Sequence, residues 1–328
     1  MHTGYVVIAG WYRTGPTPVP VRAGIGSCVG APRRQAPARR QAGRSSNSRG
    51  GVARGRRDIA SNGDVEQAEV RVTRVMAVSS QKGGIGKTTT TANLAVAWGA
   101  GGRRVLAVDL DPQFALTRRF GVVPSAAPAT AFELLAEGGS LADGVVRDVA
   151  PAVDLVAGRR ELARLELSLA GEHHREQFLA ELFLGALSDW DDVLIDCPPS
   201  LGLLTVNAIV AATEVLVPVD MTDEGALQGA AEVRAIVDRL ARHSQVSVRA
   251  LVRTMVDTRR LVYQRMNASL PELRLPIARA QIPLAAAFQN AAAERLPLMS
   301  WRGDSRGAVA YRRLADELLE PARRGANA

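Results

Sequence analysis

The chain is poor in cysteine and in aromatic residues: only Cys28 and Cys197 occur in 328 residues, and aromatics make up 4%. Two thiols are too few for a disulfide framework or for a four-thiolate iron–sulfur cluster. No apolar run reaches the roughly 18 residues of a membrane-spanning helix, and we expect no secretory signal at the start. The few aromatics give little support for a surface that stacks single-stranded bases. These shortages favour a reduced, soluble, cytoplasmic protein.

Excess positive charge is confined to the first part of the chain. Residues 1–72 hold 12 arginines and four acidic residues, whereas the remainder carries equal numbers of bases and acids. Because the segment is rich in glycine, proline and serine and has no helical or strand period, we expect 1–71 to be disordered. Its arginines suit a phosphate-binding arm; the alternative is a mis-assigned start, with the chain beginning at Val72. We therefore expect one folded domain over 72–328.

Lysine is also scarce. Of 41 basic residues only Lys82 and Lys87 are lysines, and both lie in one glycine-rich stretch, Ser-Ser-Gln-Lys-Gly-Gly-Ile-Gly-Lys-Thr-Thr. An apolar strand over 75–78 precedes this stretch, and a helical period over 90–98 follows it. In a chain that otherwise uses arginine, lysine indicates a need for a compact ammonium group.

A glycine loop between a strand and a helix is the context of a phosphate-binding loop. The glycines let backbone N–H groups turn toward phosphate oxygens, and the helix N-terminus adds partial positive charge. In such a loop Lys87 would reach the β- and γ-phosphates, and the Thr88 hydroxyl would ligate Mg²⁺.

The loop departs from the usual G-x-x-x-x-G-K-[ST] pattern, because Gln81 stands at the first glycine position and a lysine follows it. In this respect the stretch resembles the deviant Walker A motif of the ParA/MinD ATPases. The resemblance implies an α/β P-loop NTPase fold, with helices on both faces of a mostly parallel twisted sheet, and ATP and Mg²⁺ as cofactors. It also implies an ATP-sandwich homodimer in which Lys82 reaches the partner's phosphates. The phosphate-loop residues implied are Lys82, Gly83, Gly84, Ile85, Gly86, Lys87, Thr88 and Thr89.

Two further apolar strands end in carboxylates. The strand over 105–108 precedes Asp109 and Asp111, which strand alternation places on one face at the carboxyl end, where open α/β sheets bind ligands. Resemblance to the family's D-x-D-P-Q segment implies that Asp111 positions the attacking water; the alternative is two aspartates capping a turn. The strand over 193–195 ends in Asp196, which resembles a Walker B carboxylate and would hold Mg²⁺, usually through water.

The resemblance extends over about 72–319, through strands at 215–219 and 246–254 and helices at 224–240 and 311–319. By it, Met255 and Pro283 would flank the purine.

DNA contacts are less well supported. Arg259 matches a surface arginine of the family, but Ala287 replaces a DNA-contacting arginine of close relatives. Arg234, Arg239 and Arg242 either supplement Arg259 or form a solvated helix face.

The leading interpretation is a ParA-type ATPase for plasmid or chromosome segregation. Such a protein binds and hydrolyses ATP, dimerises, holds double-stranded DNA non-specifically, and is released when a ParB-like partner stimulates hydrolysis. We expect it in the cytoplasm, on the nucleoid and not on a membrane.

Three alternatives remain. A MinD-like, membrane-associated division-site ATPase ends in a basic amphipathic helix, which Pro321 and Gly325 would interrupt here. An iron–sulfur reductase of the nitrogenase iron-protein type needs two suitably spaced cysteines per subunit. An arm-driven nucleic-acid binder with a degenerate ATPase is disfavoured by the complete set of site residues.

Overall fold

The computed structural model of the chain describes residues 72–169 and 171–321. At its centre is an eight-stranded sheet with the order β3-β4-β2-β5-β1-β6-β7-β8. Neighbouring strands are parallel except for the antiparallel β3–β4 pair. The expected tail, 1–71, lies outside the described residues, so its disorder stays a prediction.

The strands are β1 Arg74–Val78, β2 Val105–Asp109, β3 Val145–Ala150, β4 Val153–Val156, β5 Asp192–Asp196, β6 Glu214–Asp220, β7 Ser247–Val256 and β8 Ile277–Pro283. The α-helices are α1 Lys87–Ala100, α2 Ala115–Arg119, α3 Ala131–Ala136, α4 Leu162–Ser168, α5 Phe178–Phe183, α6 Leu203–Ala211, α7 Gly225–Leu240, α8 Leu261–Ser269, α9 Ala286–Ala293, α10 Leu298–Trp301 and α11 Arg306–Leu319. Three short 3-10 helices span Pro124–Ala126, Leu141–Gly144 and Leu270–Leu273.

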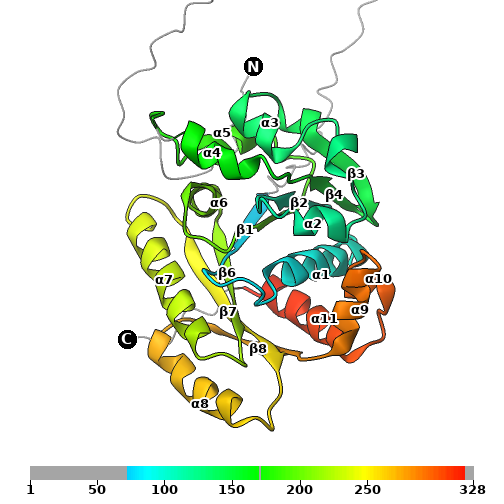
Figure 1. The fold of residues 1–328 in the computed structure, drawn as a ribbon, viewed down its shortest axis with the longest axis vertical. Helices are drawn as coiled ribbons and strands as arrows, with labels where there is room; N and C mark the ends of the chain where they lie inside the picture. Colours follow the sequence, from blue (N-terminus) through cyan, green and yellow to red (C-terminus); the bar gives the residue numbers. More distant parts are fainter. Residues whose placement is uncertain (1–71, 170, 322–328) are drawn as a thin grey trace, which may run out of the picture. The chain divides into compact units, whose positions relative to one another are not determined.

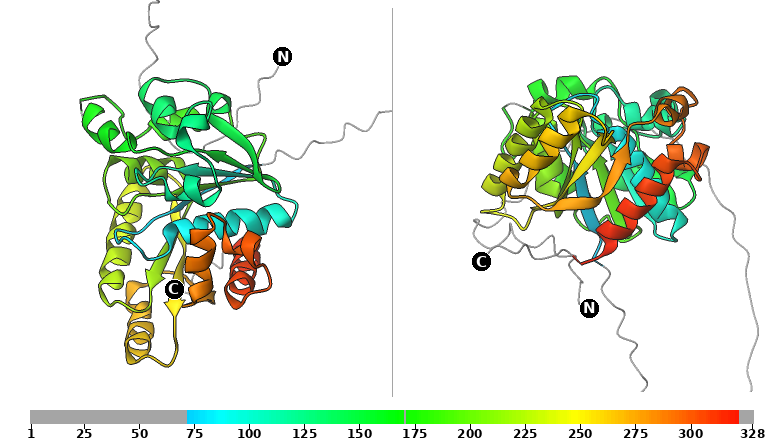
Figure 2. Two further views of the ribbon diagram at one scale, coloured as in Figure 1. Left: turned by 45° about the vertical axis from the view of Figure 1, so that its right-hand side comes forward. Right: turned by 90° about the horizontal axis from the view of Figure 1, so that it is seen from below.

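Helices cover both faces of the sheet, as Figures 1 and 2 show. Alternate residues of β1 point into different cores: Val75 and Ala77 into one shared with α6 and α7, Met76 and Val78 into one shared with α1 and α11. In the part of the chain that is described, no helix is long and apolar enough to cross a membrane. The arrangement confirms the expected α/β fold class.

The central strands agree with their apolar patterns, but the two edges of the sheet were not predicted. The β3–β4 hairpin is short and has a register shift, and its exposed residues break the apolar run. In β8 the buried residues Ala278, Ala280 and Ile282 alternate with more exposed ones. The strand therefore lacks the continuous apolar run by which the central parallel strands could be predicted. The first helix also begins earlier than its apolar period, because Lys87 is already helical.

The order in which strands are added to the sheet reverses at β1. The chain passes from β1 through α1 to β2, returns to β5 between them, and then continues through β6, β7 and β8 on the other side. Open α/β sheets bind ligands at such a switch point, outside the carboxyl ends of the strands. The loop after β1 therefore lies where a ligand is expected.

Candidate nucleotide-binding site

The loop between β1 and α1 has the backbone of an anion cradle. Gly84 and Gly86 have φ of 76° and 96°, left-handed values that other residues adopt only with strain. Helix α1 begins at Lys87, and the first N–H groups of a helix have no intrahelical acceptor. The buried Lys87 ammonium donates to the Lys82 carbonyl oxygen at 2.8 Å, across the loop. Loop, helix end and ammonium together fit the phosphates of a nucleotide.

Oxygen atoms suited to Mg²⁺ lie beside this loop. The Thr88 hydroxyl donates to Asp196 Oδ2 at 2.7 Å, and the Thr91 hydroxyl lies 3.4 Å from Asp196 Oδ1. Asp196 is the last residue of β5 and is fully buried. Because Mg²⁺ prefers hard oxygen ligands, Thr88 and Asp196 are the residues that would hold it.

The site holds three buried acidic residues, Asp109, Asp111 and Asp196, beside the buried amine of Lys87. Burial raises the pKa of Asp196 well above its usual range, and the Asp109 carboxylate raises it further, against the hydrogen bond from Thr88. Burial also lowers the pKa of Lys87, although Asp196 opposes this shift. A bound divalent cation would favour the ionised forms of these buried carboxyl groups, so the electrostatics also fit Mg²⁺.

The two aspartates after β2 have different partners. Asp109 accepts hydrogen bonds from the Thr117 backbone N–H and hydroxyl, at 2.8 and 2.7 Å, and from the Asp111 N–H at 3.2 Å. Asp111 is 8% exposed and accepts from the Gln113 N–H at 2.8 Å. Asp109 thus fixes α2 and the turn that carries Asp111. The role of Asp111 in positioning water stays a prediction.

Lys82 lies at the outer edge of the loop and is more exposed than Lys87. Its ammonium forms an ion pair with Asp223, two residues before α7, and this hydrogen bond lowers the pKa of the Asp223 carboxyl. The two side chains are 36% and 45% exposed, so solvent screens the pair. Asp223 was missed by sequence reasoning, because nothing local in the sequence relates it to a residue 141 positions away.

Thr254, near the end of β7, is a second residue that sequence reasoning missed. Its buried hydroxyl donates to the Ile85 carbonyl oxygen at 2.9 Å and so supports the phosphate loop. A hollow of about 570 Å³ lies at the ends of β7 and β8, and Val256 and Pro283 line it. The predicted purine neighbour Met255 lies between Thr254 and Val256 and has a φ of 53°.

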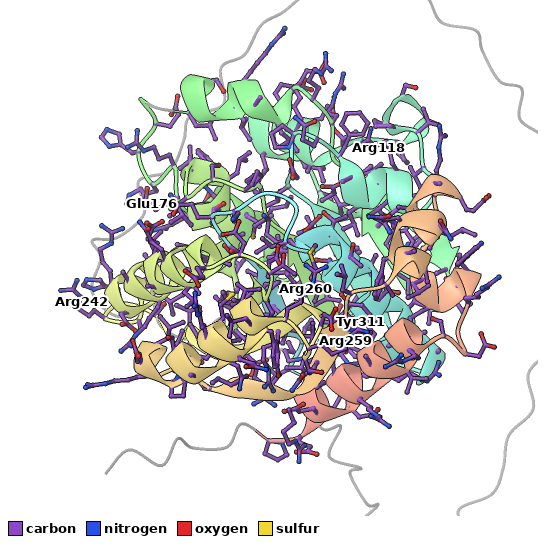
Figure 3. All side chains as sticks on the ribbon, turned by 60° about the horizontal axis from the view of Figure 1, so that its bottom comes forward. Arg118, Glu176, Arg242, Arg259, Arg260 and Tyr311 are labelled. Carbon is purple, nitrogen blue, oxygen red and sulfur yellow. The ribbon has the colours of Figure 1, made fainter. Side chains whose placement is uncertain are left out.

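The predicted DNA-contact residue Arg259, labelled in Figure 3, is 87% exposed and lines this hollow. Its guanidinium donates two hydrogen bonds to Asp257, at 2.9 and 3.0 Å, which hold its plane in one orientation. Ala287 lies in α9. Arg234 is half-buried and donates to Asp238 and to the Leu273 carbonyl oxygen, so both interpretations of the arginines on α7 stay predictions.

The fold and this site define a P-loop nucleotide-binding protein. A family model described as "AAA domain" matches residues 73–250. The sporulation initiation inhibitor protein Soj of Bacillus subtilis is 30% identical over 248 residues, which cover 75% of this chain and 98% of Soj. The chain belongs to the ParA/MinD family of P-loop NTPases.

Two solved structures agree with this assignment. One, from Mycobacterium smegmatis, is titled cobyrinic acid a,c-diamide synthase with bound ATP analog and magnesium; it is 34% identical, has a TM-score of 0.65 and matches 76% of this chain and 95% of that one. The other, the cell division ATPase MinD of Pyrococcus furiosus, is 27% identical with a TM-score of 0.64, over 75% and 98% of the two chains. The expected cofactors, ATP and Mg²⁺, are thus of the kind found in a related structure.

Proposed function

We propose that this chain is a ParA-type ATPase of DNA segregation, which dimerises around ATP, holds DNA non-specifically and is released when a ParB-like protein stimulates hydrolysis. The observation that carries the proposal is the separation of the two lysines. Lys87 is buried in the phosphate loop, whereas the Lys82 side chain is 36% exposed, so that a second subunit could reach it. A relative named chromosome partitioning protein ParA, from Caulobacter vibrioides, is 30% identical over 251 residues and supports the same function.

Each residue of the site would have a separate role in ATP hydrolysis. Lys87 and the N–H groups of the loop and of α1 would hold the phosphates, and Thr88 and Asp196 would hold the metal. Bound Mg²⁺ would neutralise charge that develops on the phosphoryl oxygens. Asp111 would orient the water, in a turn that Asp109 fixes. Lys82 would supply a cation to the other subunit.

The Asp111→Ala variant tests both the role of Asp111 and the proposed function. Because orienting water acts in the transition state, we expect the variant to bind ATP and dimerise but to hydrolyse ATP roughly 100-fold more slowly, at the lower end of general-base effects. A dimer that persists should carry more protein into the pellet when co-sedimented with plasmid DNA and ATP. Liposomes are sedimented in parallel, and Arg259→Ala serves as the DNA-surface control. Normal turnover by Asp111→Ala would contradict its role.

The parallel sedimentations with DNA and with liposomes also distinguish the alternative functions. Sedimentation with liposomes in place of DNA would support the MinD-like alternative. A synthase, as the M. smegmatis structure is titled, would couple ATP consumption to an acid substrate. Hydrolysis by this chain in the absence of any such acid, and stimulated by DNA, would therefore favour the partition function.

The Lys82–Asp223 pair leads to a further prediction. Lys82 must leave Asp223 before it can serve another subunit, so Asp223→Asn should lower the protein concentration at which ATP produces a dimer. Glu224→Gln is the matched control, because it removes the same charge from the next residue, also exposed. Light scattering against protein concentration measures the shift. A dimer that forms at an unchanged or higher concentration in Asp223→Asn would show that the two uses of Lys82 do not compete.

A further inference from the structure

The beginning of α11 separates two hollows at the β8 edge of the sheet. The smaller one, of about 570 Å³, lies at the ends of β7 and β8, and a larger one of about 830 Å³ extends between β8 and α11. Arg306, the first residue of α11, lines both. Its side chain is exposed and forms no hydrogen bond or ion pair within 72–169 and 171–321. Among the described residues, Arg306 is therefore a cation without a side-chain partner, at the wall of a cavity.

The position of Arg306 relative to the phosphate loop is fixed by packing. A Cβ on Gly307 would lie 2.6 Å from the Phe288 ring, so only glycine lets α11 approach α9 this closely. In the first turn of α1, the Thr90 hydroxyl lies 3.0 Å from the Tyr311 hydroxyl of α11, and the two helices lie side by side in Figure 1. Helix α1, which follows the phosphate loop, therefore also fixes the position of α11 and of Arg306 at its first residue.

Thr254 connects the phosphate loop to a strand end that lines the smaller hollow. Thr254, which binds the Ile85 carbonyl oxygen, lies two residues before Val256 in its wall. A nucleotide whose phosphates occupy the loop can extend its base into this hollow, where Val256, Pro283 and Leu284 offer apolar surface. An aromatic base beside a free guanidinium gains a cation–π contact.

We infer that Arg306 contacts the face of the purine base of the bound nucleotide and so contributes to the choice of ligand. The inference rests on the proposed nucleotide binding and adds a binding residue to it. Arg259 lines the same hollow, but its guanidinium is held by Asp257. Arg306 is therefore the arginine of this wall that is free to pack on a base.

The test compares nucleotide with phosphate chain alone. Arg306→Ala should weaken ATP binding about fivefold or more, the range of a partly desolvated cation–π contact, and leave the binding of Mg²⁺-tripolyphosphate unchanged, because that ligand has no base. Arg313→Ala is the matched control: it removes an exposed arginine two turns further along α11, which lines only the larger hollow. Isothermal titration calorimetry gives both affinities, and a thermal melt checks that each variant is folded.

Several outcomes would overturn the inference. Unchanged ATP affinity in Arg306→Ala excludes a contact with the base. Equal losses for ATP and tripolyphosphate assign Arg306 to the phosphates, and lost DNA co-sedimentation with intact ATP affinity assigns it to DNA. If the wild-type chain does not bind ATP at all, the proposed function fails together with the inference, and this result is distinct from the other three.

Discussion

Lys87→Ala is expected to abolish ATP binding and hydrolysis. Lys87 is 6% exposed, and its ammonium lies inside the phosphate loop, so alanine would leave the phosphate charge without its buried cation. Removing one partner of a buried, hydrogen-bonded charge pair costs about 2–5 kcal/mol. The affinity for ATP should therefore fall by at least about thirtyfold, which titration with a fluorescent ATP analogue would measure.

The control for this variant is Arg313→Ala, which removes an exposed cation far along α11 and should bind ATP normally. A thermal melt is needed as well, because the Lys82 carbonyl oxygen loses its donor in Lys87→Ala. A folded Lys87→Ala protein that retains ATP affinity and turnover would show that the loop is not a phosphate site.

Lys82→Ala should leave nucleotide binding by the monomer intact and abolish the ATP-dependent dimer. In a symmetric sandwich each subunit contributes one Lys82, so the substitution removes two contacts at once. At about 1.5–3 kcal/mol for a hydrogen bond to a charged group, the dimer should weaken by more than about a hundredfold. Sedimentation with and without ATP measures the dimer, and binding of a fluorescent ATP analogue measures the monomer.

Two further variants test the geometry. Lys82→Arg should rescue dimerisation poorly, because the planar guanidinium is larger than a compact ammonium. Gln81→Ala, at the exposed neighbouring position, should dimerise normally. If Lys82→Ala loses monomer binding as completely as Lys87→Ala, the lysine serves its own nucleotide. If Lys82→Ala still dimerises with ATP, Lys82 has no bridging role.

The phosphate loop could be predicted because its determinants are local. Strand, glycines, lysines and helix follow one another within about 25 residues, and a left-handed glycine or a helix N-terminus depends on neighbours in the chain. Asp196 could be placed for the same reason, because an apolar run that ends in a carboxylate marks the end of a buried strand. The central strands and the α/β class depend on the same short-range patterns.

What the sequence by itself determined is thus the class of fold, the phosphate loop and the strand ends that surround it. Only the tertiary structure decided which distant side chains complete the site: Asp223 beside Lys82, Thr254 beneath Ile85, and Arg306 at the hollow next to Pro283. The physical reason is that hydrophobic periodicity specifies which face of an element is buried but not which element lies against it. Those pairings come from the strand order of the sheet, which brings β6, β7 and β8 to one side of β1.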